Sequence, residues 1–147
     1  MLGETMTIRK LLLESYENLQ GDSLKGIYQH VRNIAKTDNK ELTITVNSRR
    51  NCDQFIKKIF DDKTTNKLIR GESIIDKGVS ISLKSKDGIK EYDTYGYFFG
   101  IHASQLLVNK LESNTKKEFI FIVAVSQKSE HLDEWAQTHN AEKLKIN

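Results

Sequence analysis

The segment Phe119–Val125 constrains the fold of this chain more than any other stretch. It contains seven consecutive apolar residues, and all but Ala124 are β-branched or aromatic. A run of this length and composition is typical of a strand that is buried on both faces. Such strands lie inside sheets that helices cover on both sides. We therefore expect this segment to be the central strand of an α/β domain.

The segments before this strand alternate between strand and helix patterns. Residues 103–112 have the spacing of a helix, and residues 89–101 predict a strand, which gives a strand–helix–strand unit with two parallel neighbours. Residues 42–46 alternate as a strand, and Ser48 is a good N-cap for a helix that continues to residue 60. We expect strand 42–46 to run parallel to the other two.

The remaining segments complete the predicted order. Thr7 to Leu19 and residues 24–35 both have helical spacing, which predicts an N-terminal helical hairpin over one sheet face. Residues 71–76 and 79–83 predict short strands, and Lys86-Asp87-Gly88 predicts a hairpin turn into strand 89–101. A last helix follows Ser129, and residues 141–147 either fray or form a short edge strand.

This order, ααβαβββαβα, predicts one domain over residues 1–147. The fold class is α/β, with about five strands covered by the helical hairpin and further helices; a mixed α+β arrangement remains an open alternative.

Composition indicates the cellular compartment in which we expect the protein. Cys52 is the single cysteine, so no disulfide forms within the chain, which suits a reducing compartment. No segment resembles a signal peptide, and no apolar run approaches the roughly 20 residues of a membrane helix. We expect a soluble cytoplasmic protein with no membrane contact.

The positive charge is concentrated in the middle of the chain. The net charge is +3 overall, whereas residues 47–70 carry seven basic and three acidic side chains and residues 77–90 carry four and one. Two interpretations stay open, a solvated basic face and a surface that binds an anion or nucleic acid.

Polar residues follow the three strands that we expect to be parallel. The carboxyl ends of parallel strands share one sheet edge, where open α/β sheets bind ligands. The residues expected there are Asn47, Ser48, Arg49, Arg50, His102, Ser104, Ser126, Gln127 and Ser129.

The helix start after Ser48 is the best predicted anion site. It opens with Arg49 and Arg50, so two guanidinium groups add to the positive end of the helix. The helix after Ser129 is less suitable, because the carboxylates of Glu130, Asp133 and Glu134 already satisfy its positive end and would repel an anion. The predicted anion-binding set is Ser48, Arg49, Arg50, Lys57, Lys58, Lys84, Lys86 and Lys90.

His102 is the predicted general base, with Ser104 beside it. The alternative is a packed ring at a helix start. His102-Ala103-Ser104 resembles one half of the His-x-Ser/Thr pair of 2H phosphoesterases. The second half is missing, because the comparable strand ends in Val46-Asn47-Ser48.

The element order of residues 52–126 resembles the core of PD-(D/E)xK nucleases. The resemblance implies Asp76 as the first acid, and Ser82-Leu83-Lys84 stands where Glu-x-Lys is expected. Ser82 removes a Mg²⁺ ligand, so the resemblance favours a fold relative that binds without cutting. No zinc spacing, phosphate loop or dinucleotide fingerprint is present, and we predict no metal and no cofactor.

These observations lead to three hypotheses. The first is a small basic non-enzymatic protein that recognises nucleic acid, a nucleotide or an acidic protein surface, as accessory proteins and inhibitors of phages and mobile elements do. The second is an enzyme acting on a phosphoester or nucleotide, with His102 as base and Arg49 and Arg50 as phosphate clamp. The third is a structural or assembly subunit, which would form a homo-oligomer.

Overall fold

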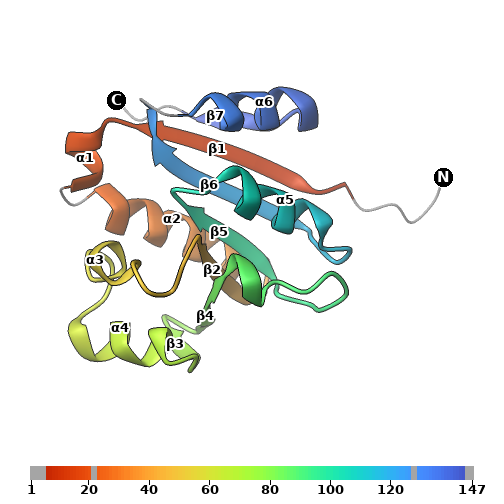
Figure 1. Ribbon diagram of the computed structural model, residues 1–147. Coiled ribbons are helices and arrows are strands. Elements are labelled where there is room, and N and C mark those ends of the chain that lie inside the picture. Colours follow the sequence, from red (N-terminus) through yellow and green to blue (C-terminus); the bar gives the residue numbers. More distant parts are fainter. Residues whose placement is uncertain (1–5, 21–22, 127–128, 145–147) are drawn as a thin grey trace.

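The computed structural model describes residues 6–20, 23–126 and 129–144, which form an α/β domain around one sheet (Figure 1). The strands are β1 (Ile8–Glu14), β2 (Leu42–Val46), β3 (Ile74–Asp76), β4 (Val79–Ser85), β5 (Tyr97–Ile101), β6 (Phe119–Val125) and β7 (Glu142–Leu144). The helices are α1 (Tyr16–Gln20), α2 (Ser23–Thr37), α3 (Asp53–Ile56), α4 (Asp62–Ile69), α5 (Gln105–Ser113) and α6 (Glu130–His139), with a 3₁₀ turn η1 (Lys86–Gly88).

The described strands are arranged in the order β3-β4-β2-β5-β6-β1-β7. The strand β6 lies between β5 and β1 and pairs parallel with both, as its apolar sequence predicted. The strand β2 pairs parallel with β4 and β5, so the predicted direction of residues 42–46 is confirmed. The short β3 is antiparallel to β4, and β7 pairs parallel with β1, so residues 142–144 adopt the edge strand, one of the two alternatives left open for the C-terminal residues.

Helices cover both faces of the sheet and create two apolar cores. Phe119, Phe121 and Val123 of β6 belong to the core under α2, α3 and α4, together with the α2 stripe that the sequence predicted. Ile120 and Ile122 belong to the core under α5 and α6. The uninterrupted apolar run of β6 therefore reflects burial on both faces.

The prediction of an N-terminal helical hairpin is wrong, because residues 8–14 form strand β1 inside the sheet. Leu11 and Leu12 have the spacing of a helical stripe with Ile8, but in the structure they enter opposite cores. Pairing with β6 and β7 outweighs the helix propensity of a segment rich in leucine and charged residues. Only α1 and α2 of the predicted hairpin are helical.

The predicted hairpin of residues 79–101 is also wrong. The strand β2 lies between β4 and β5, and the segment 89–96 crosses the sheet on the side of α5. Ile89 and Tyr95 anchor this crossing in the second core, and the Lys90 amide donates to the Tyr95 hydroxyl at 2.7 Å. The sheet of the described residues thus has seven strands instead of about five, and its order of elements begins with a strand.

The helix expected over residues 48–60 is reduced to α3, which begins after Cys52. A second helix, α4, follows, and Asp61 caps it by accepting a hydrogen bond from the Thr64 amide at 2.7 Å. Among the described residues, no helix has the length and apolarity needed to cross a membrane.

Candidate functional site

The chain leaves neighbouring strands in opposite directions at two places on the carboxyl edge of the sheet. After β2 it passes to the face of α3, and after the adjacent β5 it passes to the face of α5. After β6 it continues to α6, whereas after the adjacent β1 it continues to α1 on the other face. Ligands of open α/β sheets bind at such switch points, so this edge is the candidate site.

A cavity of about 420 Å³ opens at this edge, between α1 and α3. These two helices lie on the same side of the molecule, near the ends of the strands (Figure 1). The cavity combines two aromatic rings with an amide, an amine and an imidazole. Its lining residues are Tyr16, Leu19, Gln54, Phe55, Lys58, His102 and Val125.

His102 forms the wall of this cavity at the end of β5. Its ring meets the Phe55 ring in a T-shaped contact, with the ring centroids 5.3 Å apart. Burial lowers the pKa of His102 below its ordinary value of 6.5, so the ring is neutral at pH 7. His102 and His131 of α6 also line a smaller cavity of about 190 Å³.

Asn47 connects the ends of β2 and β5. Its side-chain amide donates to the His102 carbonyl at 2.7 Å, and its side-chain oxygen accepts from the Ser104 amide at 2.8 Å. The Lys86 ammonium donates to the Asn47 carbonyl at 3.2 Å, which brings the end of β4 to the same place. Asn47 and His102 are thus brought together, as the predicted sheet edge required.

The predicted arginines occupy a loop instead of a helix start. Arg50 is exposed, and its amide donates to the Ser48 hydroxyl at 3.2 Å. The Arg49 guanidinium donates to the Ile69 carbonyl at the end of α4. The four-residue α3 begins at Asp53, three residues beyond Arg50, so neither guanidinium lies at the first turn of a helix.

The predicted lysines are divided between different parts of the surface. Lys58 lines the cavity, and Lys57 is exposed at the end of α3. Lys86 lies at the carboxyl edge. Lys84 alternates with the core-facing Leu83 of β4, so it points to the opposite sheet face. Lys90 lies near the end of α5, because its carbonyl accepts from Asn114 at 2.8 Å.

The predicted serines have structural hydrogen bonds. The Ser104 hydroxyl caps α5 by accepting from the Leu107 amide at 3.2 Å. Ser129 is buried and donates to the Ser126 carbonyl at 3.1 Å. Gln127 lies outside the described residues.

Asp76, the acid implied by the nuclease resemblance, lies on β3 at the far edge of the sheet. It accepts hydrogen bonds from Tyr28 at 2.6 Å and from Arg32 at 3.0 Å. The Ser82 hydroxyl lies 3.0 Å from that of Ser73. Among the described residues, no group of three or more His, Cys, Asp or Glu side chains is placed to hold a metal ion.

Sequence reasoning missed the cavity residues of α1, and Gln54 as a polar member of its wall. The helical spacing of residues 7–19 predicts one long helix that includes Tyr16. The run Leu11-Leu12-Leu13 in the same segment is also compatible with a strand that is buried on both faces. Glu14 was missed as well. It pairs with Val125 across β1 and β6, and places a buried carboxyl group at the same edge.

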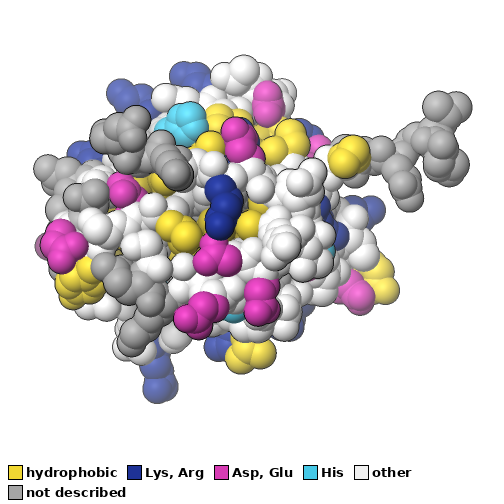
Figure 2. Space-filling model, turned by 90° about the horizontal axis from the view of Figure 1, so that it is seen from above, with side chains coloured by type: hydrophobic (Ala, Val, Ile, Leu, Met, Phe, Trp, Pro, Cys, Tyr) yellow, Lys and Arg dark blue, Asp and Glu magenta, His cyan; other side chains and the backbone are white. Residues whose placement is uncertain are grey.

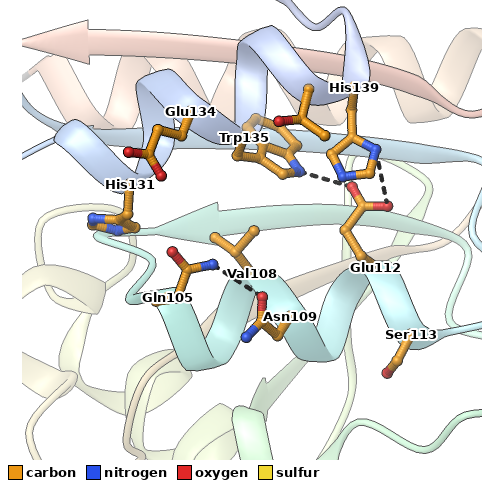
Figure 3. A pocket seen from close by; sticks show the side chains of 10 residues that line it. Gln105, Val108, Asn109, Glu112, Ser113, His131, Glu134, Trp135 and His139 are labelled. Atoms are coloured by element: carbon orange, nitrogen blue, oxygen red, sulfur yellow. Dashed lines mark hydrogen bonds and ion pairs between the residues drawn. The ribbon is translucent and has the colours of Figure 1, made fainter.

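A second hollow of about 480 Å³ lies between α5 and α6 (Figure 3). Its polar side chains largely satisfy one another. Glu112 accepts from Trp135 at 2.7 Å, Gln105 donates to Asn109 at 2.9 Å, and the His131 ring lies 2.8 Å from the Ala103 carbonyl. These pairings leave the carboxyl edge as the better candidate.

The charges of the outer face support the same choice. Figure 2 shows the molecule from the side of α6 and β7, where acidic side chains are scattered around a central basic one. Glu130, Asp133 and Glu134 belong to α6, and Lys143 of β7 pairs with Asp133 at 2.6 Å. An anion finds little positive charge on this face.

Comparison of the chain with family models, with curated proteins and with solved structures finds no match in any of the three. The function is therefore inferred from the site alone.

Proposed function

We propose that this protein is a non-enzymatic binding protein whose ligand is a nucleotide, held in the cavity at the carboxyl edge of the sheet. The observation that carries the proposal is the cavity itself, which joins the aromatic rings of Tyr16 and Phe55 to the amine of Lys58 at a switch point. Aromatic faces suit a base, and the amine suits a phosphate.

The size of the cavity supports a small ligand. A volume of about 420 Å³ falls within the range of roughly 300–1,000 Å³ that is usual for small-molecule sites. Leu19 and Val125 supply apolar surface, and Gln54 supplies one donor and one acceptor for the edge of a base. This mixture of a few polar groups on apolar walls is common in cofactor and nucleotide pockets.

The distribution of charge favours a single nucleotide over a nucleic-acid strand. Lys58 lines the cavity, whereas Lys84 and Lys90 lie elsewhere on the surface. A long strand requires a continuous series of phosphate contacts, and its binding falls steeply with salt. One phosphate group requires only the local charge at the cavity.

The test is calorimetric titration with the mono-, di- and triphosphates of adenosine, guanosine, cytidine and uridine, beside single-stranded DNA and RNA, at about 50 and 200 mM salt. We expect at least one nucleotide to bind, and Lys58→Glu to weaken that binding at least tenfold. Lys110→Glu, an exposed lysine change on α5, is the matched control and leaves the affinity unchanged. Absence of nucleotide binding at both salt concentrations overturns the proposal, as does equal affinity of Lys58→Glu.

The second candidate is an enzyme acting on a phosphate ester of the same ligand class. It is supported by the position of His102 on the cavity wall and by its lowered pKa, which leaves the ring able to accept a proton at pH 7. Arg50 is the more available member of the predicted clamp, because Arg49 is bonded to Ile69. Turnover of a phosphate ester that disappears in folded His102→Ala would favour the enzyme over the binding protein.

A further inference from the structure

We propose that His102 contacts the sugar hydroxyls of the bound nucleotide through its imidazole ring, and that Asn47 is the residue that positions this ring. The inference rests on the proposed function, since it assigns a recognition role within the same cavity. It is carried by a separate observation, the backbone conformation of His102.

His102 has a backbone φ of +52°, in the left-handed region. This region is unfavourable for residues with a β-carbon, and residues held there are concentrated at functional sites. Apart from glycines, three other described residues have a positive φ, and all three lie in turns or at helix ends. They are Asn39, Lys77 and Asn140. His102 instead follows a central parallel strand.

Hydrogen bonds hold this conformation from both sides. The His102 amide donates to the Val123 carbonyl of β6 at 2.8 Å. The His102 carbonyl accepts from the Asn47 side chain at 2.7 Å, and the same side chain accepts from the Ser104 amide at 2.8 Å. Asn47 thereby fixes the residues before and after Ala103, and with them the direction of the His102 side chain.

His102 thus lies at the boundary of two cavities. Phe55 packs its ring against the imidazole from the side of α3, and Lys58 lines the larger cavity with both residues. His131 of α6 lines the smaller cavity with His102. Glu14 lies at the end of the neighbouring β1, opposite Val125 of the cavity wall.

The chemistry of the ring points to a hydroxyl group as its partner. A neutral imidazole has one donor and one acceptor nitrogen, which matches a sugar hydroxyl that both donates and accepts. Lys58 is the stronger partner for the phosphate, since it carries a positive charge. His102 is therefore expected to distinguish a ribonucleotide from one that lacks its hydroxyl groups.

The first experiment measures this discrimination. Each nucleotide that binds in the titrations above is compared with its 2′,3′-dideoxy form in wild type, in His102→Phe and in His102→Asn. We expect wild type to prefer the ribonucleotide at least tenfold, and His102→Phe to bind both forms with the same affinity. His102→Asn keeps hydrogen-bonding groups and suits the left-handed backbone, so it checks that a loss in the Phe variant is not misfolding. Equal affinities in wild type overturn the contact.

The second experiment tests Asn47 in the ligand-free protein. The ¹⁵N shifts and the titration of the His102 imidazole are followed by NMR in wild type, in Asn47→Ala and in Asn109→Ala, a surface control on α5. We expect Asn47→Ala to move the His102 pKa toward 6.5 and to abolish the ribose preference, while the control variant behaves as wild type. If the Ala variant does not fold, Asn47→Asp is used, because it keeps the acceptor for Ser104 and loses the donor to His102.

The outcomes separate the two proposals. If no nucleotide binds wild type, the proposed function and the sugar contact both fail, and the NMR comparison still decides whether Asn47 positions the ring. If nucleotides bind but His102→Phe keeps the ribose preference, the proposed function stands and the His102 contact fails. If His102 titrates identically in wild type and in the Asn47 variant, Asn47 is not a positioning residue.

Discussion

The Glu112 carboxylate lies 2.7 Å from the indole nitrogen of Trp135, and thereby connects α5 to α6. The same carboxylate receives two hydrogen bonds of 2.7 Å from Arg9 of β1. The strand β1 and the helices α5 and α6 thus meet at one acidic group, whose side chain is 15% exposed. Figure 3 shows Glu112 directed from α5 toward Trp135 and His139.

Replacing Glu112 with Ala should destabilise the protein by roughly 3 kcal/mol, because it leaves the largely buried Arg9 guanidinium without its ion-pair partner. The measurement is urea unfolding followed by the fluorescence of Trp135, the single tryptophan of the chain. Glu134→Ala, an exposed change on α6, is the control and should leave the unfolding midpoint nearly unchanged. Equal midpoints for the two variants would contradict the role of Glu112.

Acid should weaken the same connection. Burial raises the pKa of Glu112, but the hydrogen bonds from Arg9 and Trp135 outweigh it and hold the pKa below the ordinary value of 4.5. A carboxyl group with a depressed folded pKa stabilises the protein above its unfolded pKa, and this stabilisation is lost as the pH falls through the folded pKa. Wild type should therefore lose more unfolding free energy than Glu112→Gln between pH 5 and acidic conditions. Parallel pH profiles would contradict this expectation.

His102 should act on stability in a different pH window. Burial lowers its pKa below 6.5, so the unfolded chain binds a proton at this residue more readily than the folded protein does. Stability is then full above about pH 6.5 and decreases as the pH falls toward the folded pKa. Urea unfolding at pH 7.5, 6.5 and 5.5 should show a smaller decrease for His102→Asn than for wild type. His30→Gln, a change at an exposed histidine, is the control. The same decrease in wild type and in His102→Asn would exclude His102 as the source of the pH dependence.

Asp76 is predicted to stabilise the sheet edge rather than to bind metal. It accepts hydrogen bonds from Tyr28 and from Arg32, whose residue is only 8% exposed. Asp76→Asn should cost about 2–3 kcal/mol, since it removes the counter-charge of a largely buried guanidinium. Thermal unfolding by circular dichroism checks this. Asp87→Asn, on the exposed turn η1, is the control, and an Asp76 variant as stable as that control would contradict the assignment.

The sequence allowed the α/β class and the central strand to be predicted, because β6 contains the apolar run that double burial requires. It also allowed the parallel direction of β2 and the sheet edge that holds Asn47 and His102 to be predicted. These predictions depend on local apolar pattern and on the geometry of strand–helix–strand units, both of which the sequence contains directly.

The remaining fold depends on pairing between distant segments. The strand β1 contains leucine and charged residues, which favour helix locally, and only its neighbours β6 and β7 make it a strand. Because Thr43 and Thr45 are polar, the sequence of β2 alternates between apolar and polar residues. Both threonines are buried: the Thr43 hydroxyl donates to the Tyr95 carbonyl of the crossing segment, and the Thr45 hydroxyl donates to the Phe99 carbonyl of β5. Because β2 lies between β4 and β5, these two strands cannot form the hairpin that the Asp87-Gly88 turn favours.

The candidate site was only partly predictable for the same reason. Its cavity depends on α1, which follows the misassigned β1, and on the short α3, whose expected first turn at Arg49 is a loop. Charge counted along the chain groups Lys58 with Lys84. In the structure Lys58 lines the cavity beside α3, whereas alternation along β4 directs Lys84 to the opposite sheet face. Spatial grouping of charge requires the sheet order, which composition does not contain.

Two glycines should respond in opposite directions to the same substitution. Gly96 has a φ of +74°, and a β-carbon there would lie 2.4 Å from the Glu41 carbonyl oxygen, a backbone atom that cannot move aside. Gly96→Ala combines a left-handed backbone with this overlap, so it should destabilise the protein by at least about 2 kcal/mol. It would also displace the start of β5, the strand that His102 directly follows.

Gly26→Ala is the matched comparison. Gly26 lies within α2, and nothing approaches the position of its β-carbon within 4 Å. Alanine should therefore stabilise the helix by about 0.5–1 kcal/mol, because it lowers the conformational entropy of the unfolded chain. Urea unfolding of both variants, followed by Trp135 fluorescence, should move the two midpoints to opposite sides of the wild-type value. A Gly96→Ala midpoint at or above wild type would mean that the connection from the crossing segment into β5 differs from the one described.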